Sequence, residues 1–465
     1  MNPFLNPITG LPFLKYFLFD TGRINRLSPG EMDKHRNKSL RKIVKYAYTV
    51  PLYHKKYREA NIHPDDIKEI SDIEKLPFVK RKDIADNYPD GIVPEGYNKN
   101  KAQLLNTSGS TGKPVSFFTD FSTMAESVPI TIRGWQMYKL NWRKSRFAYL
   151  LNYGTNSLYN VHSVSKNVIH SNVNSIIPLK NHQYFNILAP LKIIIKQLDE
   201  FKPDFIVSNP DTYYHLAFLK NKGYGKNINP KILATGGSIL DSITRKYIQD
   251  SFGCNMHELY GSVESSSVIS IECFKGCWHI QHDYYHIEAV DENGLSVEPN
   301  KKGKIVLTRL YGKGTPFVRY TGLDDTIMLS SDYKCGCGLN SPIFKGGIEG
   351  RPSLHNIILK DGRLIPAPLL SFVPIILEEL KTRKIKQYQI IQKNIDDIDI
   401  LIEIDENLRN IGPSIGMIFD KIEEAYKNIF GPDVKLSIKE VKKIKIPEDK
   451  PFSSVISYVK PEDVY

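Results

Sequence analysis

The amino-acid sequence predicts an α/β protein. We expect a large N-terminal portion of several α/β subdomains, one of them β-rich, and a small α+β domain at the C-terminus. A chain of 465 residues is too long for one ordinary core. Short apolar strands alternate with helices up to about residue 252, strands dominate after about residue 280, and a β-β-α-β unit follows Pro352. These changes predict an N-terminal domain over 1–350, its β-rich subdomain over about 280–350, and a C-terminal domain over 352–465.

The elements follow from hydrophobic spacing and turn residues. Helices are expected over 31–60, 122–140, 187–200, 210–221, 239–252 and 415–429. Strands are expected over 103–105, 115–118, 147–151, 205–208, 231–234, 256–259, 286–290, 303–308, 326–329, 388–392, 398–404 and 435–441.

Charge is distributed unevenly along the chain. The formal net charge is +12, and the C-terminal part from Pro352 has a net charge of −1, so the positive excess lies in the N-terminal part. This excess suits an anionic ligand such as a nucleotide. No basic stripe is interleaved with aromatic residues, so a nucleic-acid partner is not expected.

No stretch approaches 18 uncharged apolar residues, so no transmembrane segment is expected. The apolar stretch 11–19 is interrupted by Lys15 and lacks the features of a signal peptide. It can be an amphipathic segment that docks on the body or, as a peripheral contact, on a membrane surface. Five cysteines in a long chain do not indicate a disulfide scaffold, and a cytoplasmic protein is expected.

Residues 107–114, Thr-Ser-Gly-Ser-Thr-Gly-Lys-Pro, combine four hydroxyls, two glycines and a lysine. Glycines allow close backbone approach, and the amides, hydroxyls and Lys113 can bind phosphate oxygens. A Walker A motif is excluded because Thr107 stands where it requires glycine and Pro114 follows Lys113. The loop joins two short strands, which predicts a hairpin turn. A flexible polar surface loop is the alternative.

Two further turns carry acidic residues. In Tyr260-Gly261-Ser262-Val263-Glu264, which follows a strand, the ring can contact a base and the carboxylate can bind Mg²⁺. In the segment from Arg319 to Asp325, a carboxylate after the glycine turn can accept both ribose hydroxyls. The alternatives are a turn with an exposed glutamate and an ordinary salt-bridged turn.

Cysteine and histidine residues gather in two short segments. Cys335-Gly336-Cys337 forms a tight pair, and Cys273 and His279 lie about 60 residues earlier, with Cys277 between them. Four such ligands suit a tetrahedral structural Zn²⁺. We expect Cys273, His279, Cys335 and Cys337 as ligands, with Cys277 as a substitute. Unrelated reduced cysteines are the alternative.

The order of these motifs, completed by Gly350-Arg351, resembles the adenylate-forming (acyl-CoA synthetase, or AMP-binding) superfamily. The Cys/His segment makes the chain most similar to phenylacetate–CoA ligase-like and CapK-like capsule polysaccharide biosynthesis members. The resemblance covers roughly residues 35–460.

The resemblance implies roles for individual residues. It places Glu264 on Mg²⁺, Asp324 on the ribose hydroxyls, and Arg351 near the nucleotide at a hinge. Lys450, on a mobile C-terminal domain, would bridge the substrate carboxylate and the α-phosphate. The implied phosphate-binding and adenine-side residues are Ser108, Gly109, Ser110, Thr111, Gly112, Lys113, Gly236, Gly237, Tyr260 and Gly261.

The sequence departs from the family pattern at three places. Asp449 replaces the glycine before Lys450, Ser238 stands where relatives often carry glutamate, and Pro352-Ser353 replaces acidic residues. An inactive relative that serves as a binding or scaffold protein is therefore one alternative.

The function implied by the resemblance is ATP-dependent activation of a carboxylate through acyl-AMP, with release of pyrophosphate. The acyl group is then transferred to CoA. The resemblance implies that the whole reaction serves surface polysaccharide biosynthesis. ATP, Mg²⁺, structural Zn²⁺ and CoA are the implied cofactors. An amide ligase that uses the amine of a sugar precursor or amino acid is the other alternative. The sequence specifies neither the carboxylate nor the oligomeric state.

Overall fold

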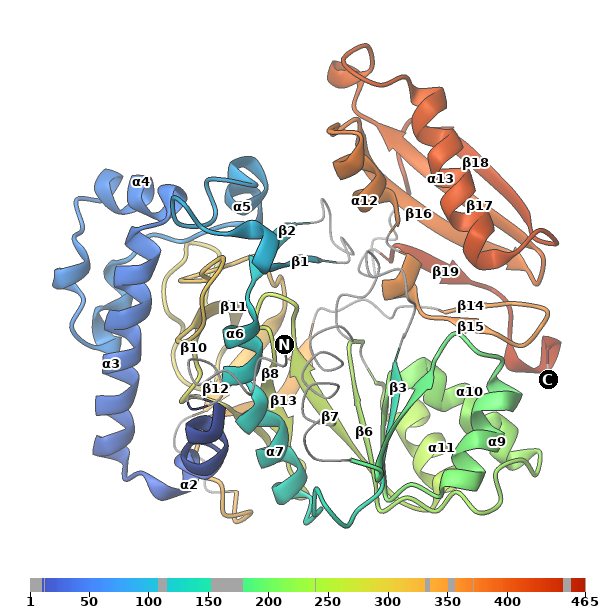
Figure 1. Cartoon of the computed structure of the whole chain (residues 1–465), viewed down its shortest axis with the longest axis horizontal. Coiled ribbons are helices and arrows are strands. Elements are labelled where there is room, and N and C mark those ends of the chain that lie inside the picture. Colours follow the sequence, from blue (N-terminus) through green and yellow to red (C-terminus); the bar gives the residue numbers. More distant parts are fainter. Residues whose placement is uncertain are drawn as a thin grey trace.

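The computed structural model describes residues 11, 13–107, 115–151, 179–238, 240–330, 335–349, 356–370, 372–445 and 453–464. Figure 1 shows a large N-terminal part built around one long sheet and a smaller C-terminal part with its own sheet. The predicted α/β class with a small C-terminal domain is confirmed.

Proline residues divide two of the expected helices. The segment 31–60 forms α3 (Pro29–Tyr48) and α4 (Pro51–Glu59), and the segment 122–140 forms α6 (Phe121–Glu126) and α7 (Val128–Met137). Pro51 and Pro129 lie in the first turn of the second helix of each pair, where a missing N–H is tolerated. The other elements of this region are η2 (Tyr16–Asp20), α2 (Arg23–Arg26), η3 (Pro64–Asp66), η4 (Ile70–Lys75), α5 (Arg81–Asn87), η5 (Lys99–Lys101), β1 (Gln103–Asn106) and β2 (Ser116–Thr119).

Eleven strands form the large sheet, in the order β10-β11-β12-β13-β9-β8-β7-β6-β5-β3-β4. From β4 to β7 the pairings are parallel, and beyond β7 they are antiparallel. Strands β9 to β13 therefore belong to the same sheet as the parallel strands. The strands are β3 (Phe147–Leu151), β4 (His182–Asn186), β5 (Phe205–Ser208), β6 (Ile232–Gly236), β7 (Asn255–Gly261), β8 (Val268–Glu272), β9 (Trp278–Ile280), β10 (Tyr285–Val290), β11 (Lys302–Arg309), β12 (Thr326–Ser330) and β13 (Ile343–Glu349).

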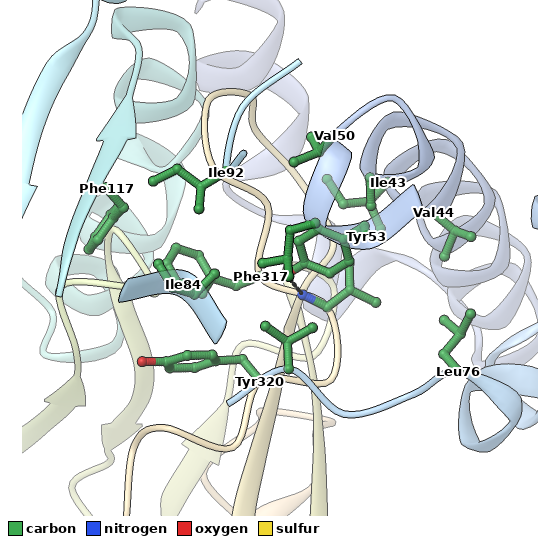
Figure 2. Packing of buried hydrophobic residues seen from close by; sticks show 14 of the residues in the cluster. Ile43, Val44, Val50, Tyr53, Leu76, Ile84, Ile92, Phe117, Phe317 and Tyr320 are labelled. Atoms are coloured by element: carbon green, nitrogen blue, oxygen red, sulfur yellow. Dashed lines mark hydrogen bonds between the residues drawn. The ribbon is translucent and has the colours of Figure 1, made fainter. Parts of the chain in front are cut away.

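Helices cover both sides of the parallel strands. The helices α9 (Leu191–Phe201), α10 (Pro210–Asn221) and α11 (Ser242–Phe252) pack together on one face, and α7 contributes Ile130 to the core on the other face (Figure 1). A further core joins the N-terminal helices to the β1–β2 hairpin and to the segment after β11 (Figure 2). There Tyr53 is fully buried and donates a hydrogen bond to the carbonyl oxygen of Pro316 at 2.8 Å, which fixes α4 against the segment after β11.

The C-terminal part has a four-stranded sheet in the order β18-β17-β16-β19. Its elements are η7 (Ala367–Leu370), α12 (Phe372–Glu379), β16 (Ile385–Asn394), β17 (Asp397–Ile404), η8 (Glu406–Leu408), α13 (Ile415–Phe430), β18 (Lys435–Val441), β19 (Val455–Ser457) and η9 (Pro461–Asp463). The hairpin β14 (Ile357–Ile358) and β15 (Leu364–Ile365) precedes it. Ile358 of this hairpin packs in the core under α9–α11, and Ile357 packs in the C-terminal core, so the hairpin bridges the two parts.

Within the described part of the chain, no helix combines the length and the apolar character needed to cross a bilayer.

Candidate active site

The glycines predicted to lie along adenine occur where parallel strands end. Strand β6 pairs with β7 so that Gly236 aligns with Leu259, one residue before Tyr260. A Cβ atom on Gly236 would lie 2.4 Å from the carbonyl oxygen of Leu259, and Gly237 has a φ of +93°. A larger residue would therefore disturb either the pairing or the turn. Gly236, Gly237 and Gly261 are thus brought to the carboxyl edge of the sheet, where ligands bind in open α/β folds.

Glu264 follows β7 and is only 3% exposed. Its Oε1 atom accepts a hydrogen bond from the Tyr320 hydroxyl at 3.2 Å. Its backbone carbonyl accepts another from Arg309 Nη1 at 3.1 Å. These contacts hold a buried carboxylate in one orientation at the end of β7. A carboxylate oxygen is the ligand type that Mg²⁺ prefers, so the residue fits the predicted role.

Tyr260 lies beside the turn that carries Asp324. Its hydroxyl donates to Oδ2 of Asp325 at 2.5 Å, and its ring meets Phe344 edge-to-face with centroids 5.7 Å apart. Asp324 itself is exposed and has a φ of +58°. The structure therefore brings the Tyr-Gly-x-x-Glu motif and the acidic turn together, although they are about 60 residues apart in sequence.

Arg319 lies in a structural network. Its guanidinium forms a buried ion pair with Glu288 at 2.7 Å and donates to the carbonyl oxygens of Glu74 and Leu76. Arg319 thus makes the ion pair expected of an ordinary salt-bridged turn, which was the alternative interpretation of this segment. Its contacts also join the N-terminal helical region to β10.

The residues Ser108, Gly109, Ser110, Thr111, Gly112 and Lys113 lie outside the described residues, but the base of their loop is described. Thr107 N donates to Val115 O, and Val115 N donates to Thr107 Oγ1, each at 2.9 Å. Strands β1 and β2 pair antiparallel, so the predicted hairpin is confirmed.

Sequence reasoning missed Arg81, which links this hairpin to the acidic turn. Its Nη1 donates to Thr107 Oγ1 at 3.3 Å, and its Nη2 donates to the carbonyl oxygen of Gly322 at 2.9 Å. No motif marks Arg81, because its partners are 26 and 241 residues away in the chain.

Arg351 and Lys450 also lie outside the described residues. Arg351 follows β13, which ends at Glu349, and Lys450 lies between β18 and β19. The short strand β19 was not predicted. It pairs with β16 in parallel, and a strand of three residues leaves little hydrophobic periodicity in the sequence.

The predicted Cys/His cluster assembles from Cys273 directly after β8, His279 within β9, and Cys335 and Cys337 in the segment before β13. The ligand atoms of Cys273, His279, Cys335 and Cys337 all lie within 4.8 Å of one another. The Sγ atoms of Cys273 and Cys335 are 3.4 Å apart, and Cys337 Sγ lies 3.2 Å from His279 Nε2. Tetrahedral Zn²⁺ with bonds of about 2.3 Å to sulfur requires ligand separations of about 3.7 Å. The four side chains therefore fit a zinc ion.

The surroundings of the cluster also suit a metal. His279 Nδ1 lies 3.1 Å from Ser341 Oγ, which leaves Nε2 facing the sulfurs. The amide of Lys275 donates to Cys273 Sγ and the amide of Leu339 donates to Cys337 Sγ, each at 3.4 Å. Burial raises the pKa of the Cys273 thiol, but hydrogen bonds with His279 and backbone amides outweigh it and lower the pKa to about 6. Such a pKa favours the thiolate that binds metal at Cys273, whereas burial raises the pKa of Cys335 and Cys337.

The two other cysteines differ in position. Cys277 lies beside Cys335 but is not a member of the four-residue group. Cys254 packs against the core under α9–α11, and burial raises its pKa to about 12.

The chain is similar to curated ligases over most of its length. It is 27% identical over 385 residues to the phenylacetate-coenzyme A ligase of Pseudomonas putida, covering 80% of this chain and 81% of that one. It is 25% identical over 403 residues to the phenylacetate-coenzyme A ligase of Thermus thermophilus, covering 83% and 84% of the two chains. No protein-family model matches.

Solved structures share the fold. A 2-hydroxyisobutyryl-CoA ligase in complex with 2-HIB-AMP and CoA aligns with a TM-score of 0.62 at 19% identity, over 94% of this chain and 91% of that chain. An open conformation of this ligase aligns with a TM-score of 0.60 over 93% of both chains. Together with the curated relatives, these findings support an adenylate-forming ligase with the fold of the acyl-CoA ligases.

Proposed function

We propose that the protein activates a small carboxylate with ATP and transfers the acyl group to CoA. The observation that carries this proposal is the convergence of two acidic motifs at one sheet edge. The Tyr320–Glu264 and Tyr260–Asp325 hydrogen bonds join the end of β7 to the turn that holds Asp324. ATP with its metal ion presents a cation and two ribose hydroxyls, and carboxylates can bind both; Glu264 and Asp324 would serve one each.

In the first step, a carboxylate oxygen of the substrate attacks the α-phosphorus of ATP. The bond from that phosphorus to the oxygen bridging it to the β-phosphorus breaks, and pyrophosphate leaves with the electron pair. The family resemblance supports phosphate binding by residues 108–113 and nucleotide contact by Arg351. It also supports Lys450 as the cation that offsets charge between the carboxylate and the α-phosphate. Asp324 would accept both ribose hydroxyls, and Gly236, Gly237, Tyr260 and Gly261 would border adenine.

Glu264 would hold Mg²⁺, which supplies charge neutralisation to the phosphates. The Tyr320 hydrogen bond fixes the carboxylate before the metal binds. This orientation reduces the reorganisation needed in the transition state.

In the second step, the thiol of CoA gives its proton to solvent and its sulfur attacks the acyl carbon. The bond to the AMP oxygen breaks, which releases AMP and the thioester. In the superfamily the C-terminal domain rotates between these steps. The resemblance places the hinge of this rotation near Arg351, a few residues before the β14–β15 hairpin, which packs in both cores.

Cys273, His279, Cys335 and Cys337 would hold a structural Zn²⁺. The metal would tie the β8–β9 turn to the segment before β13. It would stabilise this end of the sheet without taking part in the reaction.

The resemblance to CapK-like proteins supports a context in surface polysaccharide biosynthesis. In that context an amine of a sugar precursor is the competing acceptor. Turnover of a carboxylate panel with ATP and either CoA or candidate amines separates the two acceptors, and product with amines alone would favour the amide ligase.

Exchange of label between pyrophosphate and ATP tests the activation step. Lys450→Ala should abolish exchange while calorimetry shows ATP binding retained, whereas Lys445→Ala, at an exposed position, should leave exchange unchanged. Unchanged exchange in Lys450→Ala would refute the role of Lys450. Failure of the wild type to bind ATP would favour the inactive binding-protein alternative.

A further inference from the structure

The segment before α3 presents apolar side chains to solvent. Residues 11 and 13–15 are helical and continue into η2. We call Leu11, Leu14, Leu18 and Phe19 the N-terminal apolar face; they are 66%, 51%, 58% and 53% exposed. Their spacing places them along one side of the helix. Exposed apolar patches of this kind mark interaction sites.

The opposite side of the same segment is fixed to the body. Phe17 meets Trp142 edge-to-face with ring centroids 6.1 Å apart. Arg133 of α7 donates to the carbonyl oxygens of Asp20 at 2.9 Å and Thr21 at 3.1 Å. Arg133, Asp20 and Thr21 are buried, and Phe17 and Trp142 are half-buried. These contacts fix the inner side of the segment to the body, so the apolar face points to solvent.

Basic side chains border this face. We call residues 139–146, between α7 and β3, the basic loop; Lys139, Arg143, Lys144 and Arg146 in it are all exposed. The guanidinium of Arg143 lies 4.6 Å from the centre of the Trp142 ring, which is the ring that Phe17 contacts.

The sequence around the loop is also depleted of acidic residues. Residues 127–198 contain nine Lys and Arg residues and no Asp or Glu. Asp204 accepts a hydrogen bond from the Arg146 amide at 2.8 Å, but its carboxylate also pairs with Lys231 at 3.1 Å. The loop at this border is therefore cationic, and the acidic residues near Tyr16 of the same segment, Asp20 and Glu126, are not exposed.

We propose that the N-terminal apolar face and the basic loop together dock on an anionic membrane surface. The apolar side chains would enter the boundary between headgroups and acyl chains, and the loop would contact lipid phosphates. A second copy is a poorer occupant, because a two-fold interface would bring two cationic borders together. Figure 1 shows α2 and the C-terminal end of α7 at the edge of the molecule away from β16–β18, so docking leaves the C-terminal domain clear.

Vesicle co-sedimentation of the full chain tests this proposal. Phosphatidylcholine vesicles are compared with vesicles that also contain phosphatidylglycerol, at low and high salt. Leu14→Gln/Leu18→Gln removes half of the apolar face, and Arg143→Gln/Lys144→Gln removes half of the basic loop. The matched controls are Ile243→Gln/Ile411→Gln and Lys442→Gln/Lys443→Gln, which change exposed side chains elsewhere.

We expect wild type and both controls to sediment with the anionic vesicles only, and less at high salt. The apolar variant should lose binding. The basic variant should bind roughly 30-fold more weakly, since each basic residue near an anionic surface contributes about fivefold. All variants should keep wild-type unfolding temperatures and pyrophosphate exchange. The proposal is overturned if wild type binds neither vesicle, or if the apolar variant sediments like wild type. It is also overturned if light scattering shows a wild-type dimer that Leu14→Gln/Leu18→Gln dissociates without any vesicle binding.

Discussion

The Tyr320 hydroxyl donates a hydrogen bond to Oε1 of Glu264 across 3.2 Å, although the two residues are 56 positions apart. Both side chains are buried, and Tyr320 also belongs to the core that joins the N-terminal helices to the β1–β2 hairpin and to the segment after β11 (Figure 2). The position of the Glu264 carboxylate therefore depends on the packing of a hydrophobic core. Any change in that core should alter the proposed metal site.

Tyr320→Phe should weaken adenylation more than folding. Loss of the hydroxyl leaves Glu264 without this donor, so pyrophosphate exchange should fall about tenfold and half-saturation should require more Mg²⁺. The free energy of unfolding should fall by only about 1 kcal/mol, as for one hydrogen bond. Tyr213→Phe, which removes a buried hydroxyl that donates to Ile206 O, is the matched control. Equal exchange rates in the two variants would contradict the role given to Tyr320.

Arg81→Ala should raise the KM for ATP about tenfold, because the variant loses two charged hydrogen bonds that join the base of the 107–114 loop to the Asp324 turn. Arg81→Lys should restore part of the affinity, since one ammonium group replaces only part of a planar guanidinium. Lys82→Ala, an exposed neighbour, should behave as wild type. A KM for ATP that does not change in Arg81→Ala would show that the loop is positioned by other contacts.

The sequence predicted individual helices and strands better than the contacts between residues that are distant in the chain. Strand β3 and helix α10 matched because buried apolar runs and a proline at the helix start are local signals. The segment 31–60 is helical as expected, but it is divided because Pro51 begins a second helix. Strand β19 was missed because it depends on pairing with β16. In the site, Glu264 and the Cys/His group stood in recognisable motifs, whereas Arg81 acts through partners distant in sequence that no local pattern specifies.

Removal of the proposed zinc ligands should release the metal and destabilise the sheet. Cys335→Ser/Cys337→Ser should lose about one equivalent of zinc by elemental analysis, and its unfolding temperature should fall. The four-ligand group lies between β8–β9 and β13, so the loss should loosen that end. Cys254→Ala, outside the group, should keep its zinc. Wild-type protein that contains no zinc after purification without chelators would refute the site.

Stability should fall in mild acid because several histidines are held neutral. Burial lowers the pKa of His215 to about 4, of His282 to about 4 and of His286 to about 3. For His286 the geometry agrees, since Arg36 Nη2 donates to its Nδ1 at 2.9 Å and a protonated Nδ1 could not accept. Below its ordinary pKa of about 6.5 each histidine binds a proton in the unfolded chain and not in the folded one, so stability decreases as pH falls.

His286→Gln measures how much one of these histidines contributes to the pH dependence of stability. Glutamine retains an acceptor for Arg36 but does not titrate, so the loss of unfolding free energy between about pH 7 and pH 5 should shrink by roughly 1–2 kcal/mol. Urea titrations across this range measure the slope. If His286→Gln showed the wild-type slope, His286 would be free to take up a proton in the folded protein, and the Arg36 contact would not keep it neutral.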